Sequence, residues 1–240
     1  MVDIHVFLLC NNEEAIIRQT IEHYQRLGSN DITIFDNEST DKSREIAEQM
    51  NCKIIPVVTD GLMNEFVLTN LKNQCWNNIS SGWCIVADMD EWLFVSNEEL
   101  LSEDERGTTI LSVEGHNMVS QSNSVLLTDI DLHNVRSGYP YSRESKNICF
   151  KRPDIEQMNY DYGAHNCNPS GNIRFSEKQY RLNHMAWLGL PYILDKMKRR
   201  QERAEYLKNQ YGINRHYFET EEFFIQQYRE NLKLSGFDAK

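Results

Sequence analysis

The sequence of 240 residues lacks several features that mark broad classes of protein. It has no excess of positive charge, because 25 basic residues against 36 acidic ones leave a net charge of −11. Proteins that wrap nucleic acid need a basic face, so no nucleic-acid partner is expected. No apolar run approaches the roughly 18 residues that a membrane-spanning helix needs, and no basic, apolar leader begins the chain. We therefore expect a cytoplasmic protein without an integral membrane segment.

The chain also lacks paired cysteine motifs. It has six cysteines, but no two are spaced as in the C-x-x-C motifs of metal and redox sites. Several lie in apolar, strand-like runs, where a cysteine usually acts as a small hydrophobic residue. We expect reduced thiols in the core. No internal repeat, low-complexity tract or linker interrupts the sequence, so the simplest expectation is one domain with a C-terminal helical appendage.

Apolar runs and helical periodicity alternate along the first ninety residues or so. The runs predict strands at 4–10, 32–35, 53–58 and 83–87, and the periodic segments between them predict helices at 15–27, 42–50 and 64–80. This alternation with short loops predicts a parallel sheet with helices on both faces.

The rest of the chain is less regular. Three more strands are predicted at 108–113, 124–127 and 147–151, a short acidic helix or loop at 98–105, and helices at 192–211 and 219–234. Residues 115–146 and 154–180 are rich in polar residues and tyrosine without clear periodicity. Such segments are typical of substrate-binding loops on a rigid scaffold.

The most informative stretch is the apolar run at 83–87 and the acidic residues that follow it, Asp88, Asp90 and Glu91. Carboxylates at the end of a buried strand would lie at the edge where open α/β sheets bind ligands. Asp88 and Asp90 are two residues apart, so on an extended strand they face the same way. Their repulsion would be relieved by a divalent cation that takes oxygen ligands from both. The pattern predicts a metal and an anionic, phosphorylated substrate, and a solvated acidic turn is the alternative.

Several motifs, in this order, resemble those of GT-A-fold, family-2-like glycosyltransferases, in particular a subgroup with a D-x-D-E-F/W motif. They are the loop N-N-E-E at 11–14, the turn D-N-E-S-T-D at 36–41, the segment D-M-D-E-W at 88–92, and the later segments at 146–153, 163–165 and 182–185. The resemblance implies an α/β fold with a mixed, mainly parallel sheet flanked by helices. It implies a transferase domain at 1–190, with a nucleotide-sugar half at 1–95 and an acceptor half at 96–190. The helical appendage would then span 191–240.

The same resemblance implies a reaction and its site residues. A sugar would move, with inversion, from a nucleotide-diphosphate sugar (a UDP-sugar by default) to a hydroxyl of a glycan or other acceptor. Asp88 would face the ribose or a metal-bound water, while Asp90 and His184 would bind the metal, Mn²⁺ or else Mg²⁺, which stabilises the leaving diphosphate. Asp36 would contact the base or ribose, unless it only begins a turn. Further contacts to the nucleotide sugar are expected from Asn11, Glu13, Lys72, Lys146 and Lys151.

A basic cluster lies in the helix predicted at 192–211. Closing over the diphosphate is one interpretation of this cluster, and a solvated helix face is the other, favoured by the interspersed Glu202 and Glu205. Its members are Lys196, Lys198, Arg199, Arg200 and Arg203.

The catalytic base has no clear motif, since the expected E-D pair is absent from the sequence. The candidates are Glu91, Glu114, Asp161 and His165. Glu91 has an alternative role beside the metal ligands. Aromatic residues of the later half are candidates for an acceptor groove or for core packing: Trp92, Tyr139, Tyr141, Tyr160, Tyr162 and Trp187.

Two other functions are compatible with these motifs. A nucleotidyltransferase or sugar-nucleotide pyrophosphorylase shares the α/β sheet and the metal, but it usually carries a glycine-rich, basic loop after the first strand. The acidic loop at 11–14 counts against it. The second alternative is a non-catalytic GT-A-like module that binds a glycan or a partner protein.

Overall fold

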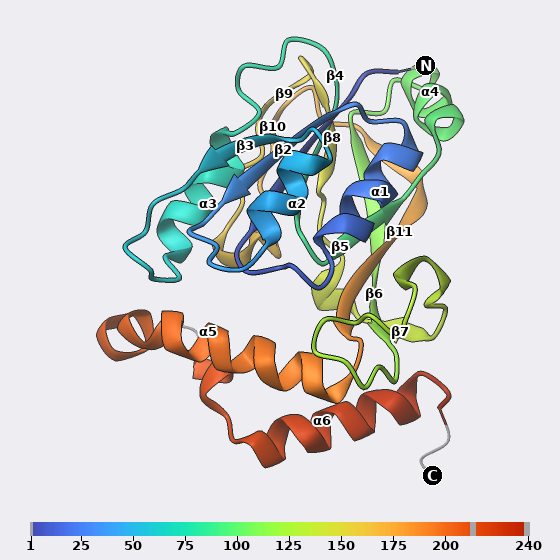
Figure 1. The fold of residues 1–240 in the computed structure, drawn as a ribbon. Coiled ribbons are helices and arrows are strands. Elements are labelled where there is room, and N and C mark those ends of the chain that lie inside the picture. The colour runs from blue at the N-terminus through green and yellow to red at the C-terminus, as the bar shows by residue number, and fades with distance from the viewer. Residues whose placement is uncertain (1, 212–214, 238–240) are drawn as a thin grey trace.

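The computed structural model of the chain describes residues 2–211 and 215–237. In these residues the central sheet has nine strands, in the order β3-β2-β1-β4-β8-β6-β11-β5, with β7 paired to β6 (Figure 1). The predicted fold class, a mixed and mainly parallel α/β sheet flanked by helices and followed by C-terminal helices, is confirmed. The strands are β1 (Ile4–Cys10), β2 (Asp31–Asp36), β3 (Lys53–Pro56), β4 (Gly82–Asp88), β5 (Glu91–Phe94), β6 (Ile110–Val119), β7 (Gly138–Pro140), β8 (Cys149–Arg152) and β11 (Phe175–Trp187).

Strands β1 to β4 form the parallel half of the sheet. The crossovers between them are α1 (Ile17–Leu27), α2 (Ser43–Gln49) and α3 (Glu65–Gln74), as parallel pairing requires. Parallel strands bring their carboxyl ends to one edge. Cys10 is paired in register with Asp36, and Leu9 with Asp88, so the ends of β1, β2 and β4 lie together.

Helix α1 shows why the first crossover forms where it does. Ile17, Ile21 and Tyr24 recur at helical spacing and are fully buried against the sheet. The helix ends at Gly28, whose φ of 112° is costly for any residue with a Cβ.

Each face of the sheet has its own hydrophobic cluster, because successive strand residues point to opposite faces. On one face Val6 and Leu8 of β1 pack with α1. On the other, Phe7 packs with Val86 of β4 and with Trp76, just beyond α3. The sheet is therefore covered on both sides, and its carboxyl edge is left as the place where polar side chains gather.

The second half of the sheet is mixed and differs more from expectation. β8 is antiparallel to β4 and β6, β11 is parallel to β6, and β5 is antiparallel to β11. The strand predicted at 124–127 is wrong: these residues form a turn in which Ser122 and Asp129 hydrogen-bond. The loop predicted at 154–180 is also wrong at its end, because β11 begins at Phe175. Polar residues of this strand, such as Glu177 and Gln179, are exposed, so the segment does not show the apolar pattern from which strands are predicted.

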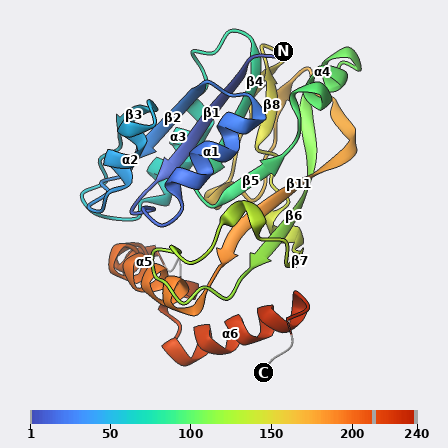
Figure 2. The same ribbon diagram turned by 45° about the vertical axis from the view of Figure 1, so that its right-hand side comes forward.

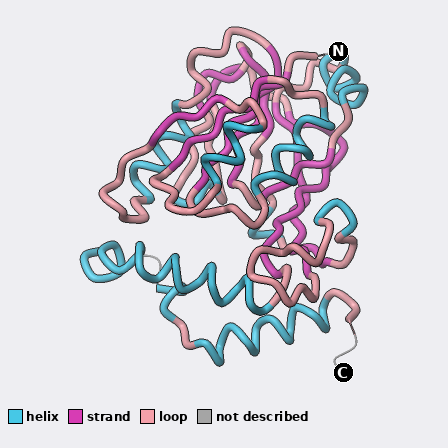
Figure 3. The backbone as a smooth tube through the Cα atoms, in the orientation of Figure 1, coloured by secondary structure: helices cyan, strands magenta, loops and turns pink. Residues whose placement is uncertain are grey.

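The helices α5 (Leu190–Tyr211) and α6 (Glu221–Leu234) form a separate layer beneath the carboxyl edge of the sheet (Figures 1 and 2). Figure 3 shows this helical layer in cyan below the magenta strands. The Tyr228 hydroxyl of α6 donates to the main-chain oxygen of Ser120, at 2.7 Å. The remaining elements are α4 (Asn97–Glu105), β9 (Ile155–Gln157), β10 (Ser170–Gly171), and the 3₁₀ turns η1 (Leu132–Asn134), η2 (Ser142–Glu144), η3 (Tyr162–Ala164) and η4 (Arg215–Phe218).

Across the described ranges, none of the helices combines the length and the apolar character needed to cross a membrane.

Candidate active site

A cleft of about 970 Å³ lies between the carboxyl edge of the parallel strands and the helical layer. Asn11 follows β1, Asn37 follows β2, and Asp88 and Asp90 lie at the end of β4. From the other side, the basic residues of α5 and the aromatic residues of α6 and η4 line it. The volume is in the range of pockets that enclose a ligand of nucleotide size.

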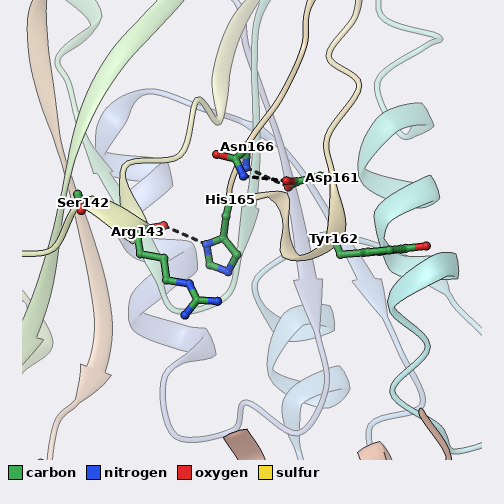
Figure 4. A pocket seen from close by; sticks show the side chains of 6 residues that line it. All are labelled: Ser142, Arg143, Asp161, Tyr162, His165 and Asn166. Carbon is green, nitrogen blue, oxygen red and sulfur yellow. Dashed lines mark hydrogen bonds between the residues drawn. The ribbon is translucent and has the colours of Figure 1, made fainter. Parts of the chain in front are cut away.

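A smaller cavity of about 290 Å³ adjoins this cleft and shares Arg143, Tyr162 and His165 with it. Figure 4 shows the His165 ring beside the Arg143 side chain, and His165 Nδ1 lies 3.0 Å from the main-chain oxygen of Arg143. Asp161, at the far side, accepts hydrogen bonds from the main chain and side chain of Asn166. Two of the predicted bases, Asp161 and His165, therefore line this side cavity, and of the two only His165 also lines the cleft.

The two β4 carboxylates are each paired with a buried lysine. Asp88 Oδ1 lies 2.8 Å from Lys72 Nζ, and Asp90 Oδ2 lies 3.0 Å from Lys196 Nζ. Asp90 Oδ2 also lies 3.4 Å from His184 Nε2. Burial alone would raise the pKa of Asp90, but the charges of Lys196 and His184 outweigh it and hold that pKa well below its usual range. Both aspartates are therefore carboxylates at neutral pH.

Glu91 holds the turn between the two aspartates in place. It is buried, and its Oε2 accepts a hydrogen bond from the main-chain nitrogen of Asp88, at 2.9 Å. Its Oε1 accepts one from Lys146 Nζ, at 2.6 Å. Since both oxygens are engaged, the geometry favours the supporting role considered for Glu91 over that of a base.

His184 is placed by its other ring nitrogen, which lies 3.0 Å from Asn117 Oδ1. Burial would lower the pKa of His184, but the neighbouring carboxylates of Asp90 and Glu144 reverse the effect and raise it. The imidazole is thus a partner of the Asp90 carboxylate, and it lies on β11 where His184 is paired in register with Glu91 of β5.

Glu144 is a site residue that the sequence reasoning missed. It lies on η2, is 7% exposed and lines the cleft. Its Oε2 is 3.2 Å from Lys146 Nζ, yet within the described residues this oxygen accepts no hydrogen bond. Burial would raise the pKa of Glu144, but His184 and Lys146 outweigh it and lower the pKa. The position two residues before Lys146, within a segment expected to be a loop, was its only signal.

Gly115 of β6 explains how η2 reaches the cleft. A Cβ at this position would lie 2.2 Å from the carbonyl carbon of Glu144, so only glycine allows η2 to cross the strand so closely. Two hydrogen bonds hold the crossing: Tyr141 donates to the Gly115 oxygen, and the Gly115 nitrogen donates to Ser145 Oγ.

Of three other predicted contacts to the nucleotide sugar, two line the cleft and one does not. Asn11 and Glu13 line the cleft, and the Asn11 side chain donates to the main-chain oxygen of Asn37, at 2.7 Å. Asp36 is buried and accepts a hydrogen bond from the main chain of Ser39, which is the turn-forming alternative.

Two further predicted site residues, in addition to Asp36, Glu91 and Asp161, do not line the cleft. Lys151, on β8, forms an ion pair of 2.8 Å with Asp104. Glu114 is half exposed and lies 3.4 Å from His116. Alternation along β6 turns Glu114 to the opposite side from its buried neighbours Val113 and Gly115, which is why it does not face the cleft.

The basic cluster of α5 faces the carboxyl edge rather than solvent. Its residues recur at 196, 199, 200 and 203, a single helical face. Arg199 donates to the main-chain oxygen of Asn12, at 2.6 Å, and Arg203 to that of Leu62, at 3.1 Å. Arg200 lies 3.7 Å from Asp90. Lys198, off this face, is exposed.

The predicted metal site is not assembled. Among the residues that the structure describes, no three histidine, cysteine, aspartate or glutamate side chains are grouped so that they could hold a metal ion. The set Asp88, Asp90 and His184 fails because Asp88 is turned to Lys72, while an ammonium group already contacts Asp90. The donors present therefore do not fit a divalent ion as they are arranged.

Comparison with known proteins gives limited similarity. No protein-family model and no curated protein sequence matches the chain. Among solved structures, glucosyl-3-phosphoglycerate synthase from Mycobacterium tuberculosis, in complex with Mn²⁺, UDP-glucose and phosphoglyceric acid, is similar to 48% of this chain at 19% identity and a TM-score of 0.33. A TarS structure from S. aureus is similar to 96% of this chain and covers 79% of its own, at 12% identity and a TM-score of 0.47. The chain spans only 44% of the synthase. Scores of this size carry no functional argument, so the site rests on its own geometry.

Proposed function

We propose that the chain is a GT-A glycosyltransferase that moves a sugar from a nucleotide-diphosphate sugar, by default a UDP-sugar, to a hydroxyl of a glycan or other acceptor. One observation carries this proposal: the Asp88 and Asp90 carboxylates, interleaved with buried cations, face a cleft of about 970 Å³ at the carboxyl edge of parallel strands. That edge is where open α/β sheets bind nucleotides. Residues of the motifs at 11–14, 36–41 and 88–92 line this cleft.

The donor half of the cleft supplies the groups that a nucleotide-diphosphate sugar needs. The side-chain amide of Asn11 can recognise the polar edge of a base, and Asp88 can accept hydrogen bonds from ribose hydroxyls. Lys146, Lys196 and Arg200 lie around the two β4 carboxylates, where a diphosphate would be held. As the bond to the anomeric carbon breaks, negative charge grows on the diphosphate. Fixed positive groups stabilise that charge.

The acceptor half differs in character. Tyr139, Tyr141, Trp187 and Phe223 line it, and the faces of aromatic rings pack well against the C–H surfaces of sugars. This composition is consistent with a sugar-bearing acceptor. The identity of the acceptor depends on the shape of this half of the cleft.

Glu144 is the group best placed to activate the acceptor. It lies between the two halves, and one of its oxygens is buried without a hydrogen-bond donor from the described residues. In the proposed single displacement the acceptor oxygen attacks the anomeric carbon and gives its proton to this carboxylate. The bond from the anomeric carbon to the diphosphate oxygen breaks, and the diphosphate leaves with the electron pair. A positioned base of this kind typically contributes a factor of roughly 10² to 10⁴ in rate.

The test is a thermal-shift screen of nucleoside diphosphates and their sugars, each with Mn²⁺, with Mg²⁺ and with EDTA. A ligand that binds only the folded protein raises its stability by mass action, by about 2.7 kcal/mol at one hundred times its Kd. We expect one nucleotide to stand out, and we expect the slow hydrolysis of its sugar conjugate to be measurable as release of nucleoside diphosphate.

Asp88→Asn should remove this shift, while Asp131→Asn, at an exposed turn outside the cleft, should leave it unchanged. A folded protein that responds to none of these donors would refute the transferase and favour the non-catalytic binding module.

A further inference from the structure

Lys196 occupies the position that a cation would take at the end of β4. Its Nζ lies 3.0 Å from Asp90 Oδ2, 3.1 Å from Glu13 Oε1 and 3.1 Å from the Tyr192 hydroxyl. An ammonium group has three N–H donors, and Lys196 gives them to Asp90 Oδ2, the Tyr192 hydroxyl and Glu13 Oε2, the last at 3.4 Å. The side chain is 3% exposed. This is a complete set of partners for a buried ammonium.

Asp88, the second carboxylate of the pair, is also paired with buried lysines. Asp88 lies between Lys72, at 2.8 Å, and Lys146, at 3.9 Å. Lys72 comes from α3, Lys146 follows η2 and Lys196 comes from α5. Three elements far apart in the sequence each deliver a buried lysine to the same pair of aspartates. Because a buried ammonium is expensive unless it is paired, this arrangement is a specific one.

Side-chain cations offset most of the negative charge of the cleft floor without any bound ion. The carboxylates are Glu13, Glu65, Asp88, Asp90, Glu91 and Glu144, and the cations beside them are Lys72, Lys146, Lys196 and Arg200. His184, 3.4 Å from Asp90, shares its charge with them when protonated. A divalent ion at Asp90 would have to displace Lys196, which would leave a buried ammonium without its main partner.

Helix α5 is also held firmly over the site. Arg199 and Arg203 bind main-chain oxygens of the loops after β1 and β3 and use no cleft carboxylate to do so. Arg200 is 29% exposed and lies 3.7 Å from Asp90, a looser contact with this carboxylate than the 3.0 Å of Lys196. Of the two cations, Arg200 is therefore the one more easily shared with a phosphate group in the cleft.

From these contacts we propose that the cleft binds the diphosphate of its donor without a divalent metal: Arg200 of α5 contacts the diphosphate, and Lys196 and Lys146, held by their carboxylates, supply fixed positive charge beside it. The carboxylate pair that resembles a metal-binding motif instead anchors these lysines. This inference rests on the proposed function, because it concerns how the same donor is held.

The experiment uses the full chain and UDP as the probe. Calorimetry measures the Kd for UDP in EDTA and in Mn²⁺, and the electron paramagnetic resonance signal of free Mn²⁺ reports how much Mn²⁺ the protein takes up. We expect the two Kd values to agree within about twofold, since both states use the same fixed cations. We expect the protein with UDP to bind no more Mn²⁺ than UDP alone.

One bound equivalent of Mn²⁺, with loss of UDP binding in EDTA, would overturn the inference and leave the transferase standing. Absence of UDP binding under every condition would instead remove the proposed function, and Mn²⁺ uptake by the protein alone would still decide the metal question.

A variant provides an independent readout. Lys196→Met keeps the unbranched stem but releases Asp90 and Glu13, so we expect the variant to weaken UDP binding at least tenfold in EDTA and to gain Mn²⁺ binding that the parent lacks. Lys198→Met, on an exposed position of the same helix, is the matched control and should change neither. Unchanged UDP binding by folded Lys196→Met would contradict the role assigned to this lysine.

Discussion

Replacing Glu91 by glutamine tests whether the buried ion pairs hold the site together. Glu91 is 1% exposed, and its Oε1 accepts a hydrogen bond of 2.6 Å from Lys146. Glutamine keeps an acceptor for the main-chain nitrogen of Asp88 but removes the charge that faces the ammonium. Breaking a buried pair by removing one charge typically costs about 3–5 kcal/mol. Lys146 retains Glu144 and Asp88 as neighbours, so we expect the lower end, about 3 kcal/mol.

The assay for Glu91→Gln is urea unfolding followed by circular dichroism, supported by a thermal scan. For a chain of this size, about 3 kcal/mol corresponds to a fall in Tm of roughly 6–12 °C. Glu48→Gln is the matched control, because it breaks an exposed pair with Arg44 on α2 and should cost less than about 1 kcal/mol. If Glu91→Gln were as mild as Glu48→Gln, the charge network would not hold the turn, and the reasoning on the site would fail.

Three further predictions concern single residues. His23 is buried against Trp92, and burial lowers its pKa to about 4, so it must stay neutral in the folded state. The free energy of unfolding that depends on a neutral His23 is fully present above the unfolded pKa of about 6.5 and is lost as pH falls towards 4. Between pH 7 and pH 5, urea unfolding of the parent should therefore lose about 2 kcal/mol more of this free energy than that of His23→Phe. Gly115→Ala should destabilise the chain by about 1–3 kcal/mol and slow turnover, since the new Cβ meets η2 at Glu144; a crystal structure with η2 unmoved would contradict this. Glu144→Gln should keep the UDP thermal shift but lower donor turnover by roughly 10² to 10⁴, and full activity would exclude it as the base.

The parallel half of the fold was predictable because its signals are local. The apolar runs of β1, β2 and β4 are bounded by polar loops, and α1 ends at Leu27, where the helix predicted at 15–27 ends. β11 was not predictable in the same way. Its exposed side chains are polar, and it forms a strand because β6 and β5 pair with it on both sides, which is a tertiary cause.

In the candidate site, too, the residues placed by local signals were predictable and those placed by tertiary contacts were not. The place of Asp88 and Asp90 was predictable, because they follow β4 and the carboxyl ends of parallel strands meet at one edge. Lys72 of α3 and Lys146, which follows η2, reach Asp88 through tertiary contacts. The orientation of Glu114 depends on the register of β6 with its neighbours, and a one-residue difference reverses the face to which a side chain points.

Glu144 could not be found from the sequence for a related reason. Its approach to the cleft depends on the close crossing of η2 over β6, which only the absence of a side chain at Gly115 permits. In the sequence this glycine lies within a polar stretch and is separated from Glu144 by nearly thirty residues. Nothing local connects the two positions.

Helix α5 shows most clearly how the candidate site depends on contacts between segments that are distant in the sequence. The boundary proposed at residue 190 would separate Asp90 and Glu13 from Lys196, their closest cation. Without α5, two carboxylates that are buried in the intact chain would lose both their cover and their counter-charge. The basic run of α5 was open to two interpretations in the sequence, as a solvated face or as a cover for a diphosphate. Its contacts with Asn12, Leu62 and Asp90 lie against the cleft, so the donor site that we propose includes cations of this C-terminal helix.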